Sequence, residues 1–470
     1  MTPAARLASA ASVLDSIAQG RLPAETVLKT WASENRYAGS KDRRAVADRV
    51  YLVLRARGRL VAAMGGREDG RALVIGSLSL LDGLSLEQIE ALHSGQGYGP
   101  KPLSKQERSR LTVPTDEQPE PVAAGLPEFV LEDFKSTFGD NWAVEVEALM
   151  VPRAPIDLRV NSAKATVAEV EAELRAAGLK PQRTPWSAWG LRLNAEPAPD
   201  IQAMAVFKQG RVEIQDEGSQ ITCWLANVAP GMTVVDYCAG GGGKTLGLAM
   251  QMAAVSTGRV VESEEAAKVW TPTGWVDAPV AKKAAAPQQT EGQLVAYDVV
   301  QKRLDNIKPR LQRAGASAEL HQLGPNGGGV EDMIQQADVV FVDAPCTGSG
   351  AWRRRPEDAW RLKPEDVDRM HTLQMGIVAR AAKLVKPGGR LVYVTCSMLR
   401  GENESTLDAF EEDHPSFMPV AIADAVNTAN FTSAGRGKLA SLAAGGHRLR
   451  LSPATSGTDG FFVAVYERQA

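Results

Sequence analysis

A chain of 470 residues is long enough for two or three domains with a large core. Its 53 basic and 56 acidic side chains leave a formal net charge of -3, so any nucleic-acid surface must be a local patch. The 4 cysteines form no CxxC pair, which argues against a disulfide scaffold and a zinc site, and no apolar run approaches the roughly 20 residues of a membrane span. We expect a cytoplasmic protein without a signal peptide, a membrane segment or a bound metal.

The first 95 residues are rich in Ala, Leu and Arg and predict a small helical bundle. Apolar residues recur there at helical spacing, first over 5–18 and again over 23–34. The basic cluster Lys41-Asp-Arg-Arg44 can contact RNA or form a solvated helix face. From 96 to 127 the composition changes to Gly, Pro, Ser and charged residues, which is typical of a linker.

Residues 128–206 predict a small α+β module. Its expected elements are two helices, a strand, a helix and a strand, in chain order at 128–138, 141–150, 155–161, 166–177 and 189–193. Arg159 and Asn161 lie on the first of these strands, where they can face a substrate or solvent. The pattern alone favours surface residues of a strand.

Residues 207–470 predict a doubly wound α/β domain. One strand ends in Asp236 and continues into the glycine-rich stretch Tyr237-Cys-Ala-Gly-Gly-Gly-Gly-Lys244, which lacks the spacing of a phosphate P-loop. A second strand, 292–298, ends in Asp298, and an acid at that place commonly holds a ribose diol. Glycines let the backbone approach a ligand closely, so we expect a nucleoside-containing cofactor. NAD and S-adenosylmethionine both fit this pattern.

A long insertion separates these two strands. The connection in such a unit needs few residues, so we expect 256–291 to be a solvent-exposed insertion. Val260-Val261 and Trp275-Val276 can pair there as a small hairpin. A third strand is expected at 319–323.

Two later strands each end near a thiol. The apolar run 339–342 leads into Asp343-Ala-Pro-Cys-Thr-Gly-Ser-Gly350, and the strand 390–395 leads into Cys396. Proline and glycine place the first thiol, Cys346, on a loop, where ligands can approach. Alone, that loop is equally a surface turn with an incidental cysteine, but the second strand-end thiol favours a functional pair.

Arginines and tryptophans follow the first thiol loop. Arg353-Arg-Arg355 can hold phosphates, and Trp352 and Trp360 can stack on bases.

The motifs together resemble the Nop/Sun family of RNA cytosine-5 methyltransferases, in particular its bacterial RsmB-like branch. The segments that carry the resemblance are Asp236-Tyr-Cys-Ala-Gly-Gly-Gly-Gly-Lys244, Asp343-Ala-Pro-Cys346, Thr395-Cys-Ser397, Gln215-Asp-Glu-Gly-Ser-Gln220 and Arg159-Val-Asn161. The likeness covers about 155–470, whereas residues 1–95 are only loosely similar to the family's NusB-like domain. It implies a class I, Rossmann-like methyltransferase sheet in 207–470, after the α+β module and the helical bundle.

The resemblance also implies an activity and the residues that carry it. Such an enzyme transfers a methyl group from S-adenosylmethionine to carbon-5 of a cytosine in RNA, through a covalent Cys–cytosine intermediate. Cys396 is then the nucleophile, Cys346 helps to release the product, and Asp343 hydrogen-bonds the cytosine ring at nitrogen-3 and the amino group. The residues expected to hold the cofactor are Cys238, Ala239, Gly240, Gly241, Gly242, Gly243, Lys244, Asp298 and Asp343.

Two cysteines and two departures from the family pattern complete this prediction. Cys223 is expected in the core, and Cys238 is expected to offer its backbone rather than its sulfur. The chain has Ala-Gly-Gly-Gly-Gly-Lys where the family usually has Ala-Pro-Gly-Gly-Lys. The family's acid after the third strand has no match near Gln322, which leaves the adenine contact unassigned.

Ribosomal RNA is the expected partner, and a monomer the expected state. Transfer RNA is an alternative substrate, and a non-catalytic RNA-binding ribosome-assembly factor is an alternative function. A nicotinamide-dependent oxidoreductase fits the sheet but leaves both thiol loops unexplained. The sequence identifies neither the RNA nor the nucleotide.

Overall fold

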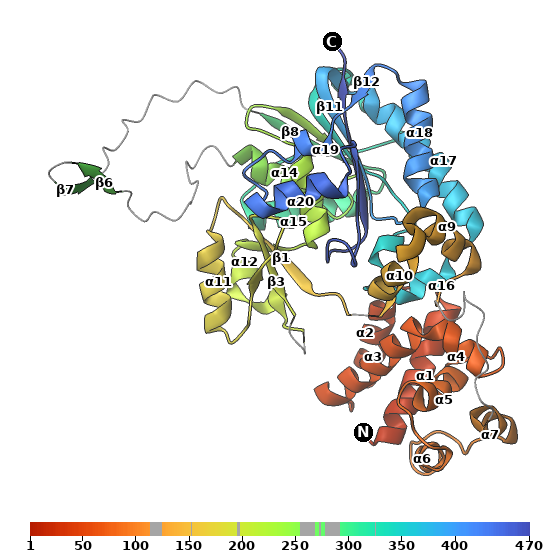
Figure 1. Ribbon diagram of the computed structural model, residues 1–470. Helices are drawn as coiled ribbons and strands as arrows, with labels where there is room; N and C mark the ends of the chain where they lie inside the picture. Colours follow the sequence, from red (N-terminus) through yellow and green to blue (C-terminus); the bar gives the residue numbers. More distant parts are fainter. Residues whose placement is uncertain are drawn as a thin grey trace.

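The computed structural model describes residues 1–112, 125–151, 153–194, 198–253, 268–271, 274–277, 292–324 and 326–470 (Figure 1). Along the chain come a helical region, a 4-stranded sheet and an 8-stranded sheet. The large sheet carries the motifs singled out in the sequence, and the other two parts lie against its domain (Figure 1).

The N-terminal region is helical, as expected, and has a hydrophobic core of its own. Its helices are α1 (Pro3–Gln19), α2 (Ala24–Glu34), α3 (Ser40–Arg55), α4 (Arg57–Ala63), α5 (Gly70–Leu80), α6 (Leu86–Leu92) and α7 (Lys105–Thr112). Helix α7 packs on α5 and α6 and lies inside the segment 96–127 that we expected to be a linker. The linker prediction is therefore wrong for Lys105–Thr112, while 113–124 lie outside the described residues.

Helices α9 (Glu128–Phe138) and α10 (Trp142–Met150) pack on each other and on residues of the large domain. Their apolar faces share a cluster with Trp352, Ala359, Met398 and Leu399, which flank the two thiol loops. The hydrophobic faces of these helices predicted their burial but not the residues that bury them.

The small module is a 4-stranded antiparallel sheet of order β2-β3-β1-β4 with helix α11 (Val167–Ala176). Its strands are β1 (Ile156–Val160), β2 (Gln182–Arg183), β3 (Gly190–Leu193) and β4 (Val212–Ile214). Strand β4, preceded by the short helix α12 (Ala205–Lys208), pairs with β1, so the module extends past the boundary expected at 206.

The large sheet has the order β12-β14-β11-β10-β5-β8-β9, with β13 paired to β14. Its strands are β5 (Thr233–Asp236), β8 (Gln293–Asp298), β9 (Glu319–Gln322), β10 (Ala337–Asp343), β11 (Val385–Thr395), β12 (Phe417–Pro419), β13 (Arg448–Leu451) and β14 (Phe461–Arg468). Strands β9, β8, β5, β10 and β11 are parallel, and β14 runs antiparallel to β11. This is the doubly wound sheet that the sequence predicts, and all its parallel strands end at one edge.

Helices cover both faces of this sheet, which explains its continuous apolar strands. One face packs on α17 (Pro364–Ala382) and α18 (Glu404–Asp413), and the other on α13 (Glu217–Leu225) and α14 (Gly243–Ala253) (Figure 1). The remaining helices are α15 (Gln301–Ala314), α16 (Pro356–Arg361), α19 (Ile422–Ala425) and α20 (Ser433–Leu442).

Within the expected insertion, only strands β6 (Lys268–Thr271) and β7 (Gly274–Asp277) belong to the described residues. They form an antiparallel hairpin in which Trp270 pairs with Trp275. The expected pairing of Trp275-Val276 with Val260-Val261 involves residues that lie outside the described part of the chain.

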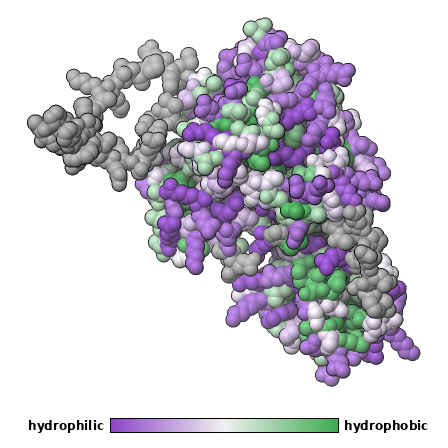
Figure 2. All heavy atoms as spheres, viewed as in Figure 1, coloured by the Kyte–Doolittle hydropathy of each residue, from purple (hydrophilic) through white to green (hydrophobic). Residues whose placement is uncertain are grey.

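The molecular face drawn in Figure 2 is mostly polar, with apolar side chains gathered over the N-terminal helical region. Among the described residues, no helix combines the length and the apolar character needed to cross a membrane. Nor do the described residues gather three or more His, Cys, Asp or Glu side chains at a place that suits a metal ion.

Candidate active site

The two strand-end thiols meet at the carboxyl edge of the large sheet. Strands β10 and β11 are parallel neighbours, with Asp343 paired to Val394, so the loops that follow them start side by side. The Sγ atoms of Cys346 and Cys396 lie 3.3 Å apart in hydrogen-bonding contact, and both side chains are partly exposed. The two strand-end thiols thus converge at one place in the fold.

Backbone and hydroxyl hydrogen bonds hold the two thiol loops together. Gly350 N donates to Cys396 O at 2.9 Å, and Met398 N donates to Ser349 Oγ at 2.8 Å. The hydroxyl groups of Ser349 and Ser397 lie 3.1 Å apart, and both side chains are fully buried. The distance between the thiols is therefore set by a buried polar network.

The two thiols differ in acidity. The hydrogen bond from Cys346 is the largest influence on Cys396 and lowers its pKa, helped by the Lys244 ammonium and opposed by burial and the Asp343 carboxylate. The same hydrogen bond, burial and the charge on Cys396 raise the pKa of Cys346. Cys396 is therefore the more acidic of the two thiols, and it loses its proton first.

Lys244 and Asp343 form an ion pair beside the thiols. Lys244 opens α14 and Asp343 ends β10, and Nζ donates to Oδ2 at 2.7 Å. Burial lowers the pKa of Lys244, but the charge of Asp343 and its hydrogen bond outweigh burial, so the pKa is raised. The Lys244 ammonium also lies 5.1 Å from the centre of the Phe461 ring. The lysine therefore stays charged next to Cys396.

The glycine loop between β5 and α14 makes a tight turn next to Asp298. Gly240 and Gly242 have positive φ angles of 54° and 80°, and a Cβ at Gly242 would lie 2.9 Å from two side-chain carbons of Ile307. Asp298 ends β8 and is 4% exposed; Oδ2 accepts from Gly240 N at 2.9 Å, and Oδ1 accepts from Val300 N at 2.8 Å. A carboxylate keeps further acceptor sites after two such bonds, so these residues fit an adenosyl cofactor.

Asp236 and the remaining cysteines lie deeper. Burial raises the pKa of Asp236 to about 7; Thr245 Oγ1 donates to its Oδ2 at 2.6 Å. Cys223 is 0% exposed in the core, as predicted. Burial raises the pKa of Cys238 well above its usual value, so its thiol is unreactive, in keeping with a backbone role.

The small module supports the glycine loop from behind. Arg159 of β1 is buried, and its guanidinium donates to Gly243 O at 3.0 Å and to the side chain of Gln215. Arg310 of α15 donates to Gly241 O and pairs with Glu213 of β4 at 3.1 Å. Arg159 is therefore no surface residue, contrary to the expectation from the strand pattern. The contact of Arg310 with the glycine loop was not predicted, because nothing in the sequence of α15 distinguishes this arginine from a surface residue.

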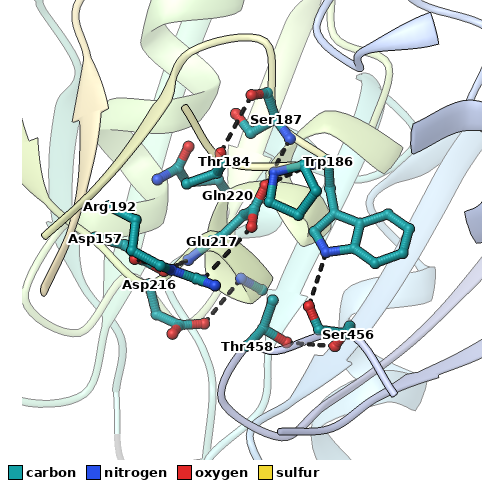
Figure 3. Close-up of polar contacts among 12 residues, drawn as sticks. Asp157, Thr184, Trp186, Ser187, Arg192, Asp216, Glu217, Gln220, Ser456 and Thr458 are labelled. Carbon is teal, nitrogen blue, oxygen red and sulfur yellow. Dashed lines mark hydrogen bonds and ion pairs between the residues drawn. The ribbon is translucent and has the colours of Figure 1, made fainter. Parts of the chain in front are cut away.

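The segment from Gln215 to Gln220 joins the small module to the large domain. Figure 3 shows Glu217 facing the turn that carries Trp186 and Ser187, whose N–H groups donate to Glu217 Oε1 at 2.7 and 2.8 Å. Asp157 of β1 accepts from Glu217 N at 3.0 Å and from Arg192 at 2.7 Å (Figure 3). This segment thus has a structural role that the sequence did not reveal.

Arg353 and Arg354 are engaged with carboxylates and not directed to a phosphate surface. Both guanidinium groups contact Asp216 and Asp459; Arg353 and Asp459 are each 5% exposed. The expected phosphate role is therefore wrong for these two arginines, because buried acids distant in sequence already bind them.

The two tryptophans of that segment are also engaged. Trp352 is 1% exposed and belongs to the cluster of α9 and α10. Trp360 Nε1 donates to Leu54 O at 3.1 Å, which ties α16 to the N-terminal helices. The expected base-stacking role is wrong for Trp352, and Trp360 serves in packing between the two parts.

Gln322 stands at the end of the third strand, next to Asp298 in the pairing of β8 and β9. Its side chain is exposed and donates to Val299 O at 3.1 Å.

Two family models match the chain. The model described as 16S rRNA methyltransferase RsmB/F matches residues 278–467, and the RsmF/B-like ferredoxin-like domain matches residues 126–199. The second match includes α9, α10, α11 and three of the four strands of the small sheet, and ends before β4.

Curated relatives are similar over part of their length. The probable ribosomal RNA small subunit methyltransferase B of Bacillus subtilis is 28% identical over 349 residues, 73% of this chain and 66% of that protein. The ribosomal RNA small subunit methyltransferase B of Enterobacter sp. is 31% identical over 284 residues, 60% of this chain and 57% of that protein. The chain thus spans less than two thirds of these relatives.

Solved structures share the fold. The crystal structure of PH0851 superposes with a TM-score of 0.72 at 22% identity and covers 100% of this chain and 99% of that one. NSun6 from Pyrococcus horikoshii with SFG gives a TM-score of 0.55 at 18% identity, covering 73% of this chain and 98% of that one. The similarity to PH0851 shows that the fold is shared over the whole chain, including the N-terminal part.

Proposed function

Because the chain belongs to the Nop/Sun family of RNA methyltransferases, in its RsmB-like branch, we propose that it methylates carbon-5 of a cytosine in ribosomal RNA. The methyl donor of this fold family is S-adenosylmethionine. The proposal rests on one observation above all, the 3.3 Å contact between Cys346 and Cys396 at the edge where the glycine loop also lies.

Cytosine needs a nucleophilic catalyst at this position. Carbon-5 is too electron-poor to attack a sulfonium methyl group, and a thiolate that adds to carbon-6 turns carbon-5 into an enamine-like nucleophile. We assign this addition to Cys396, since its pKa is lowered by the hydrogen bond from Cys346. The Cys396–carbon-6 bond forms first. After methylation a water molecule takes the carbon-5 proton, the electrons of that C–H bond restore the carbon-5–carbon-6 double bond, and the carbon-6–sulfur bond breaks to return the Cys396 thiolate.

The neighbouring groups have supporting roles in this proposal. Cys346, a neutral thiol next to the nucleophile, assists release of the product. Asp343 hydrogen-bonds the ring at nitrogen-3 and the amino group, where charge develops during addition. Lys244 orients Asp343 through their 2.7 Å ion pair.

The cofactor site is formed by the loop from Cys238 to Lys244, together with Asp298 and Asp343. S-adenosylmethionine supplies an electrophilic methyl group there. Asp298, fixed by Gly240 N–H and Val300 N–H, is placed to accept from ribose hydroxyls. The target base must be unstacked to reach the thiols, which favours single-stranded or helix-end RNA.

The test uses tritiated cofactor and three proteins. The wild type should label cytosine in ribosomal RNA, Cys396→Ala should abolish labelling, and Cys346→Ala should accumulate a covalent protein–RNA adduct. Turnover by Cys396→Ala would exclude this mechanism. Cys396→Ser is the matched control for volume, and it should be as inactive as the alanine variant.

The class of RNA is tested with purified fractions. Ribosomal RNA from cells that lack the gene should accept methyl groups, whereas transfer RNA from the same cells should not. Bisulfite sequencing of both fractions then locates the cytosine. Labelling confined to transfer RNA would replace the proposed substrate while leaving the chemistry intact.

A further inference from the structure

A single buried carboxylate, Glu402, connects both thiol loops. Thr347, which follows Cys346, donates to it with N at 2.8 Å and with Oγ1 at 2.5 Å. Ser397, which follows Cys396, donates its hydroxyl to the same carboxylate. Glu402 is 0% exposed, at the end of the 3-10 turn Arg400–Glu402.

The sheet and α17 fix this carboxylate from behind. Gln374 Nε2 donates to Glu402 Oε1 at 3.1 Å and to Pro345 O, next to Cys346, at 2.9 Å. Tyr393 of β11 donates its hydroxyl to Glu402 O at 2.8 Å. Among the described residues, no Lys, Arg or His forms an ion pair with Glu402, so its carboxylate is stabilised by hydrogen bonds from neutral groups.

We propose that Glu402 is a positioning residue for the methyl-transfer reaction, which holds the two thiol loops in register and keeps a buried negative charge beside the sulfur pair. The role in methyl transfer rests on the proposed function. The effects of Glu402 on the spacing and acidity of the two thiols do not depend on it. Desolvated anions are costly, so a carboxylate retained here without a cation indicates a use for its charge as well as its hydrogen bonds.

The charge acts on the thiol pair together with its other neighbours. The hydrogen bond with Cys396 and burial are the largest causes that raise the pKa of Cys346, and the Glu402 carboxylate adds to them. The other charged or titratable groups at the pair are Lys244 and Asp343 beside Cys396, and Tyr393 on β11, which donates to Glu402. The Glu402 charge also raises the pKa of Cys396, against the larger lowering effect of the hydrogen bond from Cys346. With Glu402 present, the loss of both thiol protons is disfavoured, and Cys346 stays neutral.

Two substitutions test the charge of Glu402 separately from the length of its side chain. Glu402→Gln removes the charge but can keep the contacts, because the hydroxyls of Thr347 and Ser397 can rotate to accept from an amide. Glu402→Asp keeps the charge but is one methylene too short to reach both loops. Glu404→Gln is the matched control, since Glu404 pairs with Arg450 at 2.5 Å and contacts neither loop.

The effect of the Glu402 charge is measured as the pH midpoint of Cys346 alkylation. Cys346 is alkylated with iodoacetamide at a series of pH values, and peptide mass spectrometry follows the extent of reaction. In a Cys396→Ser background, Glu402→Gln should lower the midpoint by roughly one pH unit, as expected for removal of a nearby charge. Glu404→Gln should leave the midpoint in place. An unchanged or raised midpoint in Glu402→Gln would overturn the role of the charge.

The effect of the side-chain length of Glu402 is measured as the rate of disulfide formation between Cys346 and Cys396 after addition of diamide. Diamide takes up the two protons and two electrons that the thiols release. Glu402→Asp should form this disulfide several-fold more slowly than the wild type, and Glu402→Gln should resemble the wild type. Equal rates in all three would overturn the positioning role. If the Glu402 variants do not fold, Thr347→Val removes one bond and should slow disulfide formation, and an unchanged rate overturns the proposal equally.

Neither measurement needs RNA or cofactor, so the two proposals fail separately. A wild type that methylates no RNA but shows both effects refutes the proposed function and retains the role of Glu402 in the thiol pair. A wild type that methylates RNA, with Glu402 variants that match it in alkylation, disulfide formation and turnover, refutes only the inference about Glu402.

Discussion

Lys244 Nζ lies 2.7 Å from Asp343 Oδ2, and this ion pair joins the cofactor loop after β5 to the thiol loop after β10. The two side chains are 12% and 27% exposed, so solvent screens their attraction only in part. The ammonium stabilises the Cys396 thiolate, whereas the carboxylate opposes it. The pair therefore couples the position of the proposed cofactor site to the acidity of the nucleophile.

Replacing Lys244 should impair the nucleophile as well as the cofactor loop. In Lys244→Met the pKa of Cys396 should rise, because the ammonium is lost and the Asp343 carboxylate remains unpaired. We expect methyl transfer to fall by about tenfold or more, with the pH profile displaced to higher pH. Lys244→Arg keeps the charge and should keep the profile. A Lys244→Met enzyme with an unshifted profile would contradict this coupling.

The cluster of Arg353, Arg354, Asp216 and Asp459 should contribute to stability and not to RNA affinity. Arg353→Met leaves two buried acids with one cation fewer, which should cost about 3 kcal/mol of unfolding free energy. Arg355, half exposed and paired with Asp358, is the control, and Arg355→Gln should change stability by less than about 1 kcal/mol. Urea unfolding and RNA filter binding measure the two effects. Normal stability with lost RNA binding would restore the phosphate role.

The thiol convergence was predictable because it follows from local rules. The strand that ends in Asp343 and the strand that leads into Cys396 are apolar and are connected through helices, so they lie parallel and end at one edge of the sheet. The arginine cluster was not predictable, since Asp216 and Asp459 lie more than 100 positions from Arg353 in opposite directions along the chain. Only the folded chain brings them together.

The boundary of the small module was missed for a similar reason. Strand β4 has 3 residues and follows a turn, so its pattern is too short to reveal its partner. It pairs with β1, more than 50 residues earlier, and not with the large sheet that follows it. Glu402 also lacks a sequence signal of its own, because a lone glutamate near a strand end is ordinarily a surface residue.

Gly242 should tolerate no side chain. Its φ of 80° disfavours an L residue, and an added Cβ would meet Ile307 on α15 at 2.9 Å. Gly388 has a φ of 75° with open space around it, so Gly388→Ala measures the backbone cost alone, about 1 kcal/mol. Thermal unfolding should show a larger loss in Gly242→Ala, and calorimetry should show weaker cofactor binding. Equal losses in the two variants would mean that contact with α15 does not matter.

Glu217 should make the folded protein less stable as the pH rises. Burial is the largest influence and raises its pKa from 4.5 to about 7, although N–H groups of Ser187 and Trp186 and the charge of Arg192 oppose this. Between about pH 4.5 and 7 the unfolded chain loses a proton that the folded chain retains, so the free energy of unfolding falls across this window. Asp236, whose pKa is also raised to about 7, adds a slope of the same sign.

Glu217→Gln removes the contribution of Glu217 to the pH dependence of the free energy of unfolding and leaves that of Asp236. The glutamine side chain of this variant is not ionisable, and its carbonyl oxygen can still accept from Trp186 N and Ser187 N, which Glu217 Oε1 does at 2.7 and 2.8 Å. Relative to the wild type, the variant should gain up to roughly 3 kcal/mol between pH 5 and pH 8, at about 1.4 kcal/mol for each unit of pKa shift. Urea unfolding of both proteins at each pH measures the difference, in which Asp236 and all other groups cancel. If the free energy of unfolding changed with pH equally in the two proteins, the carboxyl group of Glu217 would have the same pKa in the folded and unfolded chains. Glu217, at the junction drawn in Figure 3, would then not retain its proton near neutral pH.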